Sequence, residues 1–216
     1  MNESSSNNKL KRFISNFRIA VLGLEKDFVS GSIERAIFML SVPMILEMMM
    51  ESLFAVVDVF FVGKLGVDAI ATVGLTEAII MIVYSICVGL SMGVTALVSR
   101  RVGDKKHKDA SDVAFQGILI GVFLAFIIGV LGFIFAKDLL HLMGASDELI
   151  SQGYGYTQVL IGGNVTIMLL FILNAVFRGA GDASIAMRAL WISNGLNLIL
   201  DPLFIFGIGP IEGLGV

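Results

Sequence analysis

Long apolar runs separated by short polar clusters dominate the sequence from about residue 36 onward. A helix needs roughly 20 residues to cross a hydrocarbon core about 30 Å thick, and the runs reach that length. They lack the period-two alternation of barrel strands. The pattern therefore predicts an all-α integral membrane protein, with five transmembrane helices near 36–62, 69–98, 113–136, 154–178 and 186–208.

The composition agrees with a bilayer environment. Of the residues, 56% are apolar and only 15% are charged, whereas a soluble domain carries about 25% charged residues. No Walker loop or dinucleotide fingerprint occurs, so this chain is not expected to drive transport with ATP or to be an enzyme. His107 and His141 have no second ligand type at metal spacing, and no metal centre is expected. The single cysteine, Cys87, lies in an apolar run and is predicted to be buried.

Basic residues are distributed unevenly between the two predicted sides of the membrane. One side holds thirteen of the 15 Lys and Arg residues, and the other holds two. Because cytoplasmic loops carry the excess of Lys and Arg, we expect a multi-pass protein of the cell inner (plasma) membrane with a cytoplasmic N-terminus. The thirteen are Lys9, Lys11, Arg12, Arg18, Lys26, Arg35, Arg100, Arg101, Lys105, Lys106, Lys108, Arg178 and Arg188; the two are Lys64 and Lys137.

Two parts of the chain are expected: a cytoplasmic tail at 1–32 and a transmembrane bundle at 33–216. Segment 10–24 is amphipathic in pattern, which leaves open a helix or a partly disordered leader. The glycine pairs 89/93 and 117/121 have the small-xxx-small spacing of closely packed helices. Asn164-Val165-Thr166 matches a glycosylation acceptor by letter, but it lies in an apolar run and is discarded.

Three carboxylates interrupt the first apolar run. Glu47, Glu51 and Asp58 lie four and seven residues apart, which at about 100° per residue keeps them within about 40° of one helix face. An Asp at the centre of a membrane helix costs about 2.5–3.5 kcal/mol, and no Lys or Arg within the five spans is expected to neutralise the stripe. We therefore expect it to face a polar cavity and to bind a proton, a sodium ion or a cationic solute. For the glutamates, a structural role in the protonated form is the alternative.

A second polar cluster lies in the fifth apolar run. Asn194, Asn197 and Asp201 follow one another at spacings of three and four, on one helix face. Pro202 removes a backbone donor and frees carbonyl groups for an ion or water. Amides in membrane helices also form contacts between helices, so an ion site and a structural contact both remain open.

Three motifs in this order resemble the multidrug and toxic compound extrusion (MATE) family. The run from Pro43 to Gly66, which ends in Val57-Asp58-Val59-Phe60-Phe61-Val62-Gly63-Lys64-Leu65-Gly66, resembles the first helix of that family. The segment from Asn174 to Asp182 resembles the link between its helices 4 and 5, and Asn197 to Pro202 resembles its fifth-helix signature. The resemblance covers about residues 31–216.

The resemblance implies a secondary active transporter. It would exchange small cationic or amphipathic drugs for protons or sodium ions, without a cofactor and without a nucleic-acid partner. Asp58, Asn197 and Asp201 would bind the coupling ion, with Na⁺ held at the two aspartates where sodium replaces the proton. Because Asp201 is an acid rather than an amide, the resemblance points to the branch of DNA-damage-inducible F-like transporters.

The same resemblance assigns a cavity, a hinge and an overall architecture. Glu47, Glu51, Asn174 and Asn194 would line the substrate cavity, although an amide is more usual at position 51. Pro43 would be the hinge of the first helix. The family has two six-helix bundles, so this chain would supply five helices of the N-terminal bundle, truncated before helix 6, and would lack the C-terminal bundle as partner. A lipid-linked or polysaccharide flippase of the same superfamily and a non-transporting membrane fragment are the alternatives.

Overall fold

The computed structural model describes residues 3–24, 31–208 and 211–213, and nearly all of them are helical. The helices are α1 (Glu3–Leu22), α2 (Ile33–Val62), α3 (Val67–Gly103), α4 (His107–Leu142), α5 (Asp147–Gly162), α6 (Val165–Gly179) and α7 (Ala183–Phe206). A 3₁₀ turn, η1 (Gly63–Leu65), joins α2 to α3. After α7, strands β1 (Gly207–Ile208) and β2 (Ile211–Glu212) pair antiparallel. The all-helical membrane fold predicted from the apolar runs is confirmed.

Local sequence signals explain where the helices begin. The hydroxyls of Ser32 and Ser146 accept hydrogen bonds from the backbone N–H groups of Arg35 and Leu149, both at 3.3 Å. These N-caps satisfy donors that have no partner within the first helical turn. α3 follows Gly66, whose φ of 115° favours glycine.

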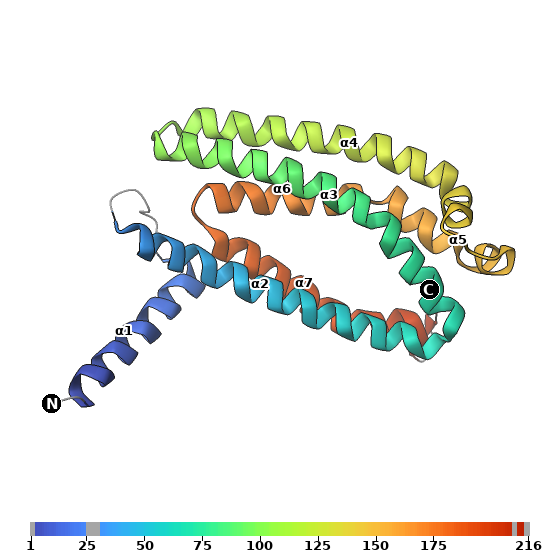
Figure 1. Cartoon of the computed structure of the whole chain (residues 1–216), viewed down its shortest axis with the longest axis horizontal. Helices are drawn as coiled ribbons and strands as arrows, with labels where there is room; N and C mark the ends of the chain where they lie inside the picture. The colour runs from blue at the N-terminus through green and yellow to red at the C-terminus, as the bar shows by residue number, and fades with distance from the viewer. Residues whose placement is uncertain (1–2, 25–30, 209–210, 214–216) are drawn as a thin grey trace.

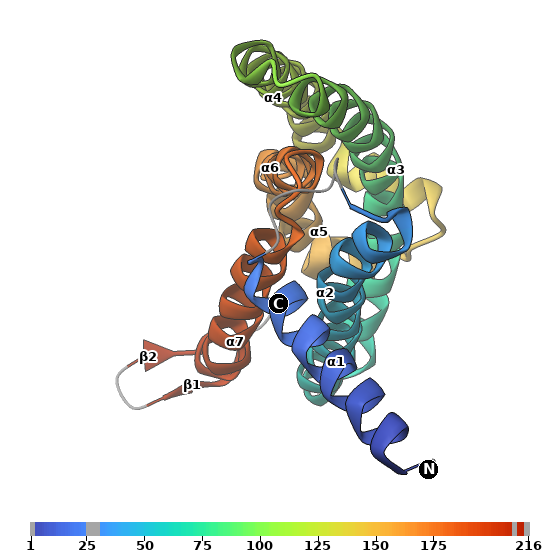
Figure 2. The same cartoon turned by 90° about the vertical axis from the view of Figure 1, so that its left-hand side faces the viewer.

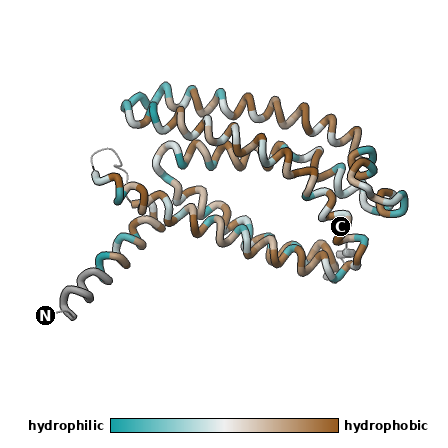
Figure 3. The backbone as a smooth tube through the Cα atoms, in the orientation of Figure 1, coloured by the Kyte–Doolittle hydropathy of each residue, from teal (hydrophilic) through white to brown (hydrophobic). Residues whose placement is uncertain are grey.

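Four helical segments of the described chain are long and apolar enough to cross a membrane. They are 67–103, 107–142, 147–179 and 183–206. The 30-residue α2, which carries four acidic residues, is not among them. However, α2 runs alongside α7 in the same direction (Figure 1). Because α7 is one of the four candidate membrane spans, α2 lies at the same depth in the membrane as α7. The hydrophobic middles and hydrophilic ends of the helices are visible in Figure 3.

The fourth predicted span, 154–178, lies within the segment 147–179, which is long and apolar enough to cross a membrane. This segment begins earlier, at Asp147, and is broken between α5 and α6 at Gly163 and Asn164. The side-chain amide of Asn164 is fully buried and donates to the carbonyls of Ile161 at 2.7 Å and Ala125 at 3.1 Å. The amide thus satisfies backbone acceptors at the break. A fully buried Asn164 is not accessible for glycosylation, as expected from its position in an apolar run.

Helices α3 to α6 form a layered bundle with its own apolar core. Its buried side chains include Ile80, Cys87, Met168 and Ile172, so the predicted burial of Cys87 is confirmed. The small residues on one face of α4 allow α6 to approach closely, because a Cβ at Gly121 would collide with the side chain of Ile172. The packing role predicted for Gly117 and Gly121 is therefore confirmed. Gly89 and Gly93 are exposed, and no described atom lies within 4 Å of a Cβ built there, so the same role for this pair stays a prediction.

Helices α2 and α7 form a separate pair beside this bundle. Figures 1 and 2 show that the pair diverges from α3 and meets the bundle through the α2–α3 and α6–α7 connections. Trp191 Nε1 of α7 donates to the carbonyl of Leu46 at 3.4 Å, and the rings of Phe61 and Phe206 pack edge to face at 6.2 Å. Helix α2 therefore has α7, its partner in the pair, on one side and α6 of the bundle on another. Its polar residues can contact either helix.

Candidate functional site

Helix α7 presents a polar stripe on the face that is least exposed. Asn194, Asn197 and Asp201 are half-buried, whereas the intervening apolar residues Leu196, Leu198 and Ile199 are exposed. Since α7 packs along α2, the stripe belongs to their shared side. The structure thus confirms that the three polar residues predicted for the fifth helix occupy one face.

Asp58 of α2 lies near this stripe. It is half-buried, and its charge lies within interaction range of the Asp201 carboxylate. Asp201 Oδ2 and Asn194 Nδ2 are both inaccessible to solvent and have no hydrogen-bond partner among the described residues. An unsatisfied buried polar atom costs about 1–3 kcal/mol. An acid from each helix, with an unpartnered carboxylate oxygen on Asp201, is an arrangement suited to a small cation.

A second polar group lies further along α2, where α6 approaches. Glu47 is buried, its Oε1 accepts a hydrogen bond from Asn174 Nδ2 at 3.4 Å, and its Oε2 lies 3.7 Å from Arg178 Nη1. The side chains of Arg178 and Glu47 are 24% and 9% exposed. At a rise of about 1.5 Å per residue, the 11 residues from Glu47 to Asp58 separate the two groups by about 16 Å along α2.

The expectation that no basic residue neutralises the acidic stripe is therefore wrong for Glu47. Arg178, one of the basic residues predicted for the cytoplasmic side, occupies the last turn of α6. Its long side chain reaches back along the helix toward α2, on the same face as Asn174 four residues earlier. The spacing of Asn174 and Arg178 could have predicted this contact, because two polar residues one turn apart in an apolar helix face the same neighbouring helix.

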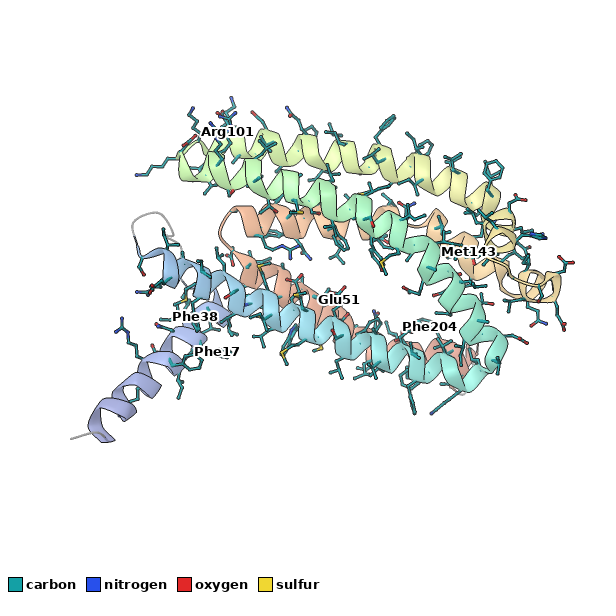
Figure 4. The ribbon with its side chains drawn as sticks, in the orientation of Figure 1. Phe17, Phe38, Glu51, Arg101, Met143 and Phe204 are labelled. Carbon is teal, nitrogen blue, oxygen red and sulfur yellow. The ribbon has the colours of Figure 1, made fainter. Side chains whose placement is uncertain are left out.

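A pocket of about 250 Å³ opens between α2, α6 and α7 at this point. Among its lining residues are Met44, Glu47, Glu51, Asn174 and Arg178. Glu51, labelled in Figure 4, is exposed, so it contributes a carboxylate at the pocket rather than an interior contact. The structure thus brings together Glu47, Glu51 and Asn174, whereas Asn194 lies with the group around Asp201.

Two residues near Asp58 were not singled out from the sequence. Glu77 of α3 lies within electrostatic range of Asp58, and the phenol of Tyr156 on α5 lies within range of both acids. Glu77 interrupts the second apolar run, just as Glu47, Glu51 and Asp58 interrupt the first. The sequence therefore carried a signal for Glu77 too. The acidic group therefore draws on α2, α3 and α7.

Pro43 lies within α2, which continues through it as one helix. The side chain is fully buried. It lines a small pocket together with Ala20 and Gly23 from the α1 segment and Asp182 and Ser184 at the start of α7. Pro202 likewise does not end α7, which continues to Phe206.

A larger pocket lies away from these acids. It measures about 660 Å³ and is a mostly apolar groove between α4 and the α5–α6 break, with residues such as Phe126, Phe133 and Val159 at its surface. No charged side chain lines it. Within the described part of the chain, no group of three or more His, Cys, Asp or Glu side chains is placed to hold a metal ion.

Known proteins share this helical arrangement. The MatE family model matches residues 43–203. A Shewanella oneidensis protein named as an FAD transporter is 30% identical over 188 residues, which cover 87% of this chain and 42% of that protein. The probable multidrug resistance protein YoeA of Bacillus subtilis is 27% identical over 186 residues, 86% of this chain and 40% of that protein.

A solved outward-facing structure of a multidrug resistance MATE family transporter of the MOP superfamily is similar with a TM-score of 0.78. It is 29% identical, and the match covers 93% of this chain and 42% of that one. The chain thus spans about two fifths of the length of these relatives. Because the family model extends from Pro43 in α2 to Leu203 in α7, the chain belongs to the MatE family of membrane transporters and not to an enzyme family.

Proposed function

We propose that the protein is a secondary active multidrug efflux transporter that exchanges a drug or toxin for protons or sodium ions. The observation that carries the proposal is the pair of acids, Asp58 and Asp201, with Asn197 on the face shared by α2 and α7. Charged groups at membrane depth are costly and mark ion pathways. The buried Asp201 Oδ2, which has no hydrogen-bond partner among the described residues, favours an exchangeable ion over a permanent structural contact.

In the proposed cycle, Asp58, Asn197 and Asp201 bind the coupling ion from outside. Neutralising one acid removes its repulsion for the other, so the α2–α7 pair closes more easily around the site. Pro43, which lacks the backbone donor of an ordinary helical residue, is the point where α2 would bend. Bending there would shrink the drug cavity and expel the drug, and release of the ion inside would reset the protein. Protons and sodium ions use the same oxygen atoms in this scheme.

The charges around the cavity favour cationic or amphipathic substrates. The pocket beside α6 contains Glu47, Glu51 and Arg178, with one negative charge in excess, and the group around Asp58 adds further acids. The exposed side chains of Met44 and Met48 supply adaptable apolar surface in the same pocket. We infer that Glu47, Glu51 and Asn174 contact the substrate in this pocket, and that Asn194 extends the substrate cavity toward the face shared by α2 and α7.

A flavin nucleotide or a lipid-linked polysaccharide is the competing substrate class. One relative is named as an FAD transporter, and FAD carries phosphate groups that would require basic residues in the cavity. Arg178 is the basic residue lining the pocket beside α6, and Glu47 already neutralises it. Uptake of a fluorescent organic cation and of FAD, compared in the same vesicles, distinguishes these classes. A non-transporting membrane fragment would support neither.

Mutation of the two acids tests the proposed coupling site. In vesicles with an imposed ion gradient, Asp58→Asn and Asp201→Asn should each abolish drug-driven ion exchange, while Glu47→Gln should have a smaller effect. The two single variants should be non-additive when combined, because they disable one site. Coupled efflux at the wild-type rate by both single variants, at matched membrane expression, would remove the ion site from these helices.

Orientation and branch complete the proposal. We place the N-terminus in the cytoplasm of the plasma membrane, since thirteen of 15 basic residues lie on that predicted side. The acid at position 201 supports assignment to the DNA-damage-inducible F-like branch.

A further inference from the structure

Helix α1 is amphipathic, and its apolar face is only partly covered by the rest of the protein. Near its end, Ala20 is buried in a cluster with Met39 and Val42 of α2. Further toward the N-terminus, Phe13, Ile14 and Phe17 are 55%, 57% and 39% exposed. Phe13 contacts α2 through an edge-to-face contact with Phe38, with ring centroids 5.7 Å apart. The three apolar side chains therefore keep a substantial uncovered surface.

The opposite side of α1 is basic. Residues 4–24 contain four Lys and Arg residues and no Asp or Glu, although the whole chain has a net charge of −3. Lys11, Arg12 and Arg18 are exposed. At about 100° per residue, the three lie about 90–150° around the helix from the middle of the apolar face, and Arg18 lies nearest to it, about 40° beyond Ile14. A basic face opposite aromatic and aliphatic side chains is typical of helices that lie in a membrane interface.

The position of α1 relative to the bundle fits that environment. Both views show α1 projecting sideways from the end of the bundle where α2 begins (Figures 1 and 2). The α3–α4 turn, with Arg101 labelled in Figure 4, lies at the same end. Arg100, Arg101, Lys105 and Lys106 cluster at that turn. This is the end at which the positive-inside rule expects the cytoplasmic leaflet, and that leaflet carries anionic lipid.

We propose that α1 is an interfacial helix that binds the anionic phospholipid surface of the membrane leaflet at the start of α2. Phe13, Ile14 and Phe17 insert into the boundary between headgroups and acyl chains. Lys11, Arg12 and Arg18 contact lipid phosphates. The complementary charge favours anionic lipid over a second protein chain, which would have to supply acidic residues around an aromatic patch. This inference does not depend on the proposed substrate or coupling ion.

Spin labels on the reconstituted protein test the proposal. In a Cys87→Ala background, nitroxides are attached at Ile14→Cys on the apolar face and at Ser15→Cys on the polar face. In vesicles of phosphatidylcholine with phosphatidylglycerol, the label at position 14 should collide mainly with oxygen, which concentrates in the bilayer. The label at position 15 should collide mainly with a water-soluble nickel complex. In phosphatidylcholine alone, the label at position 14 should move toward water.

Removing the basic side chains of α1 tests whether they bind anionic lipid. Each basic residue near an anionic surface changes binding by about five-fold, so Lys11→Gln/Arg12→Gln/Arg18→Gln should lower the lipid-bound to water-exposed ratio at position 14 by about 100-fold. Salt that shortens the Debye length from about 10 Å to about 3 Å should act in the same direction. The control Lys105→Gln/Lys106→Gln/Lys108→Gln removes equal charge at the same end of the bundle and should leave the ratio nearly unchanged.

Three outcomes would overturn the proposal. The label at position 14 would be as accessible to the nickel complex as the label at position 15, even in anionic vesicles. Alternatively, it would be protected from both reagents, which would show a protein partner on the apolar face. Finally, it would remain in lipid regardless of phosphatidylglycerol content, which would exclude recognition of anionic headgroups.

Discussion

Replacing Arg178 with methionine should destabilise the protein, because it leaves the Glu47 carboxylate buried without its counter-charge. Glu47 is 9% exposed at its side chain, and Arg178 Nη1 lies 3.7 Å from Oε2. In the absence of Arg178, the one remaining described contact to this carboxylate is the 3.4 Å hydrogen bond from Asn174. A single long hydrogen bond does not offset the desolvation of a carboxylate.

The magnitude follows from the burial of the pair. Removing one partner of a buried ion pair costs about 3–5 kcal/mol. The separation exceeds hydrogen-bonding distance and the Arg178 side chain is 24% exposed, so we expect the lower end of that range, about 3 kcal/mol. The double variant Glu47→Leu/Arg178→Met removes both charges and should be within about 1 kcal/mol of the wild type, since apolar replacement of a buried pair is often neutral.

An unfolding titration in mixed micelles, followed by circular dichroism, measures these free energies. Arg100→Met, at an exposed position near the end of α3, is the matched control and should change stability by less than about 0.5 kcal/mol. The reasoning would be refuted by an Arg178→Met variant as stable as the wild type. It would also be refuted by a double variant no more stable than Arg178→Met.

Further predictions concern topology and helix packing. Cysteines at Lys105 and Asp147, in a Cys87→Ala background, should be labelled from opposite sides of the membrane; labelling from one side would contradict the arrangement of α3, α4 and α5. Gly121→Leu should destabilise the bundle by about 1–3 kcal/mol, because the added side chain collides with Ile172. Gly93→Leu, where no described atom lies within 4 Å of a Cβ, is the control, and an equal loss there would show that the collision with Ile172 is not responsible.

The apolar runs were sufficient to predict the helical membrane fold and, to within about ten residues, the ends of its helices. The break between α5 and α6 was missed because hydropathy does not detect it. The break depends on the amide of Asn164, which bonds to Ala125, 39 residues earlier in the chain. Such a tertiary contact has no periodic signature in the sequence.

The polar stripes on α2 and α7 were predictable because residues three and four apart share a helix face. How far each acid is buried was not predictable. Glu47 is buried against α6, whereas Glu51, one turn later, is exposed, and the difference depends on where α6 crosses α2. The pairing of Glu47 with Arg178 joins residues 131 positions apart and required the fold.

Ion release on drug binding tests the central claim most directly, because it requires drug binding to be coupled to the ion held at Asp58 and Asp201. The purified protein in weakly buffered detergent solution, with a pH indicator dye or with radioactive sodium bound beforehand, is mixed with a fluorescent organic cation. The wild type should release a proton or a sodium ion as the cation binds, and Glu47→Gln should retain the release. Asp58→Asn and Asp201→Asn should bind the cation, if at all, without releasing an ion. Release of the same amount of ion by both aspartate variants and the wild type would contradict the account and leave Asp58 and Asp201 as structural groups.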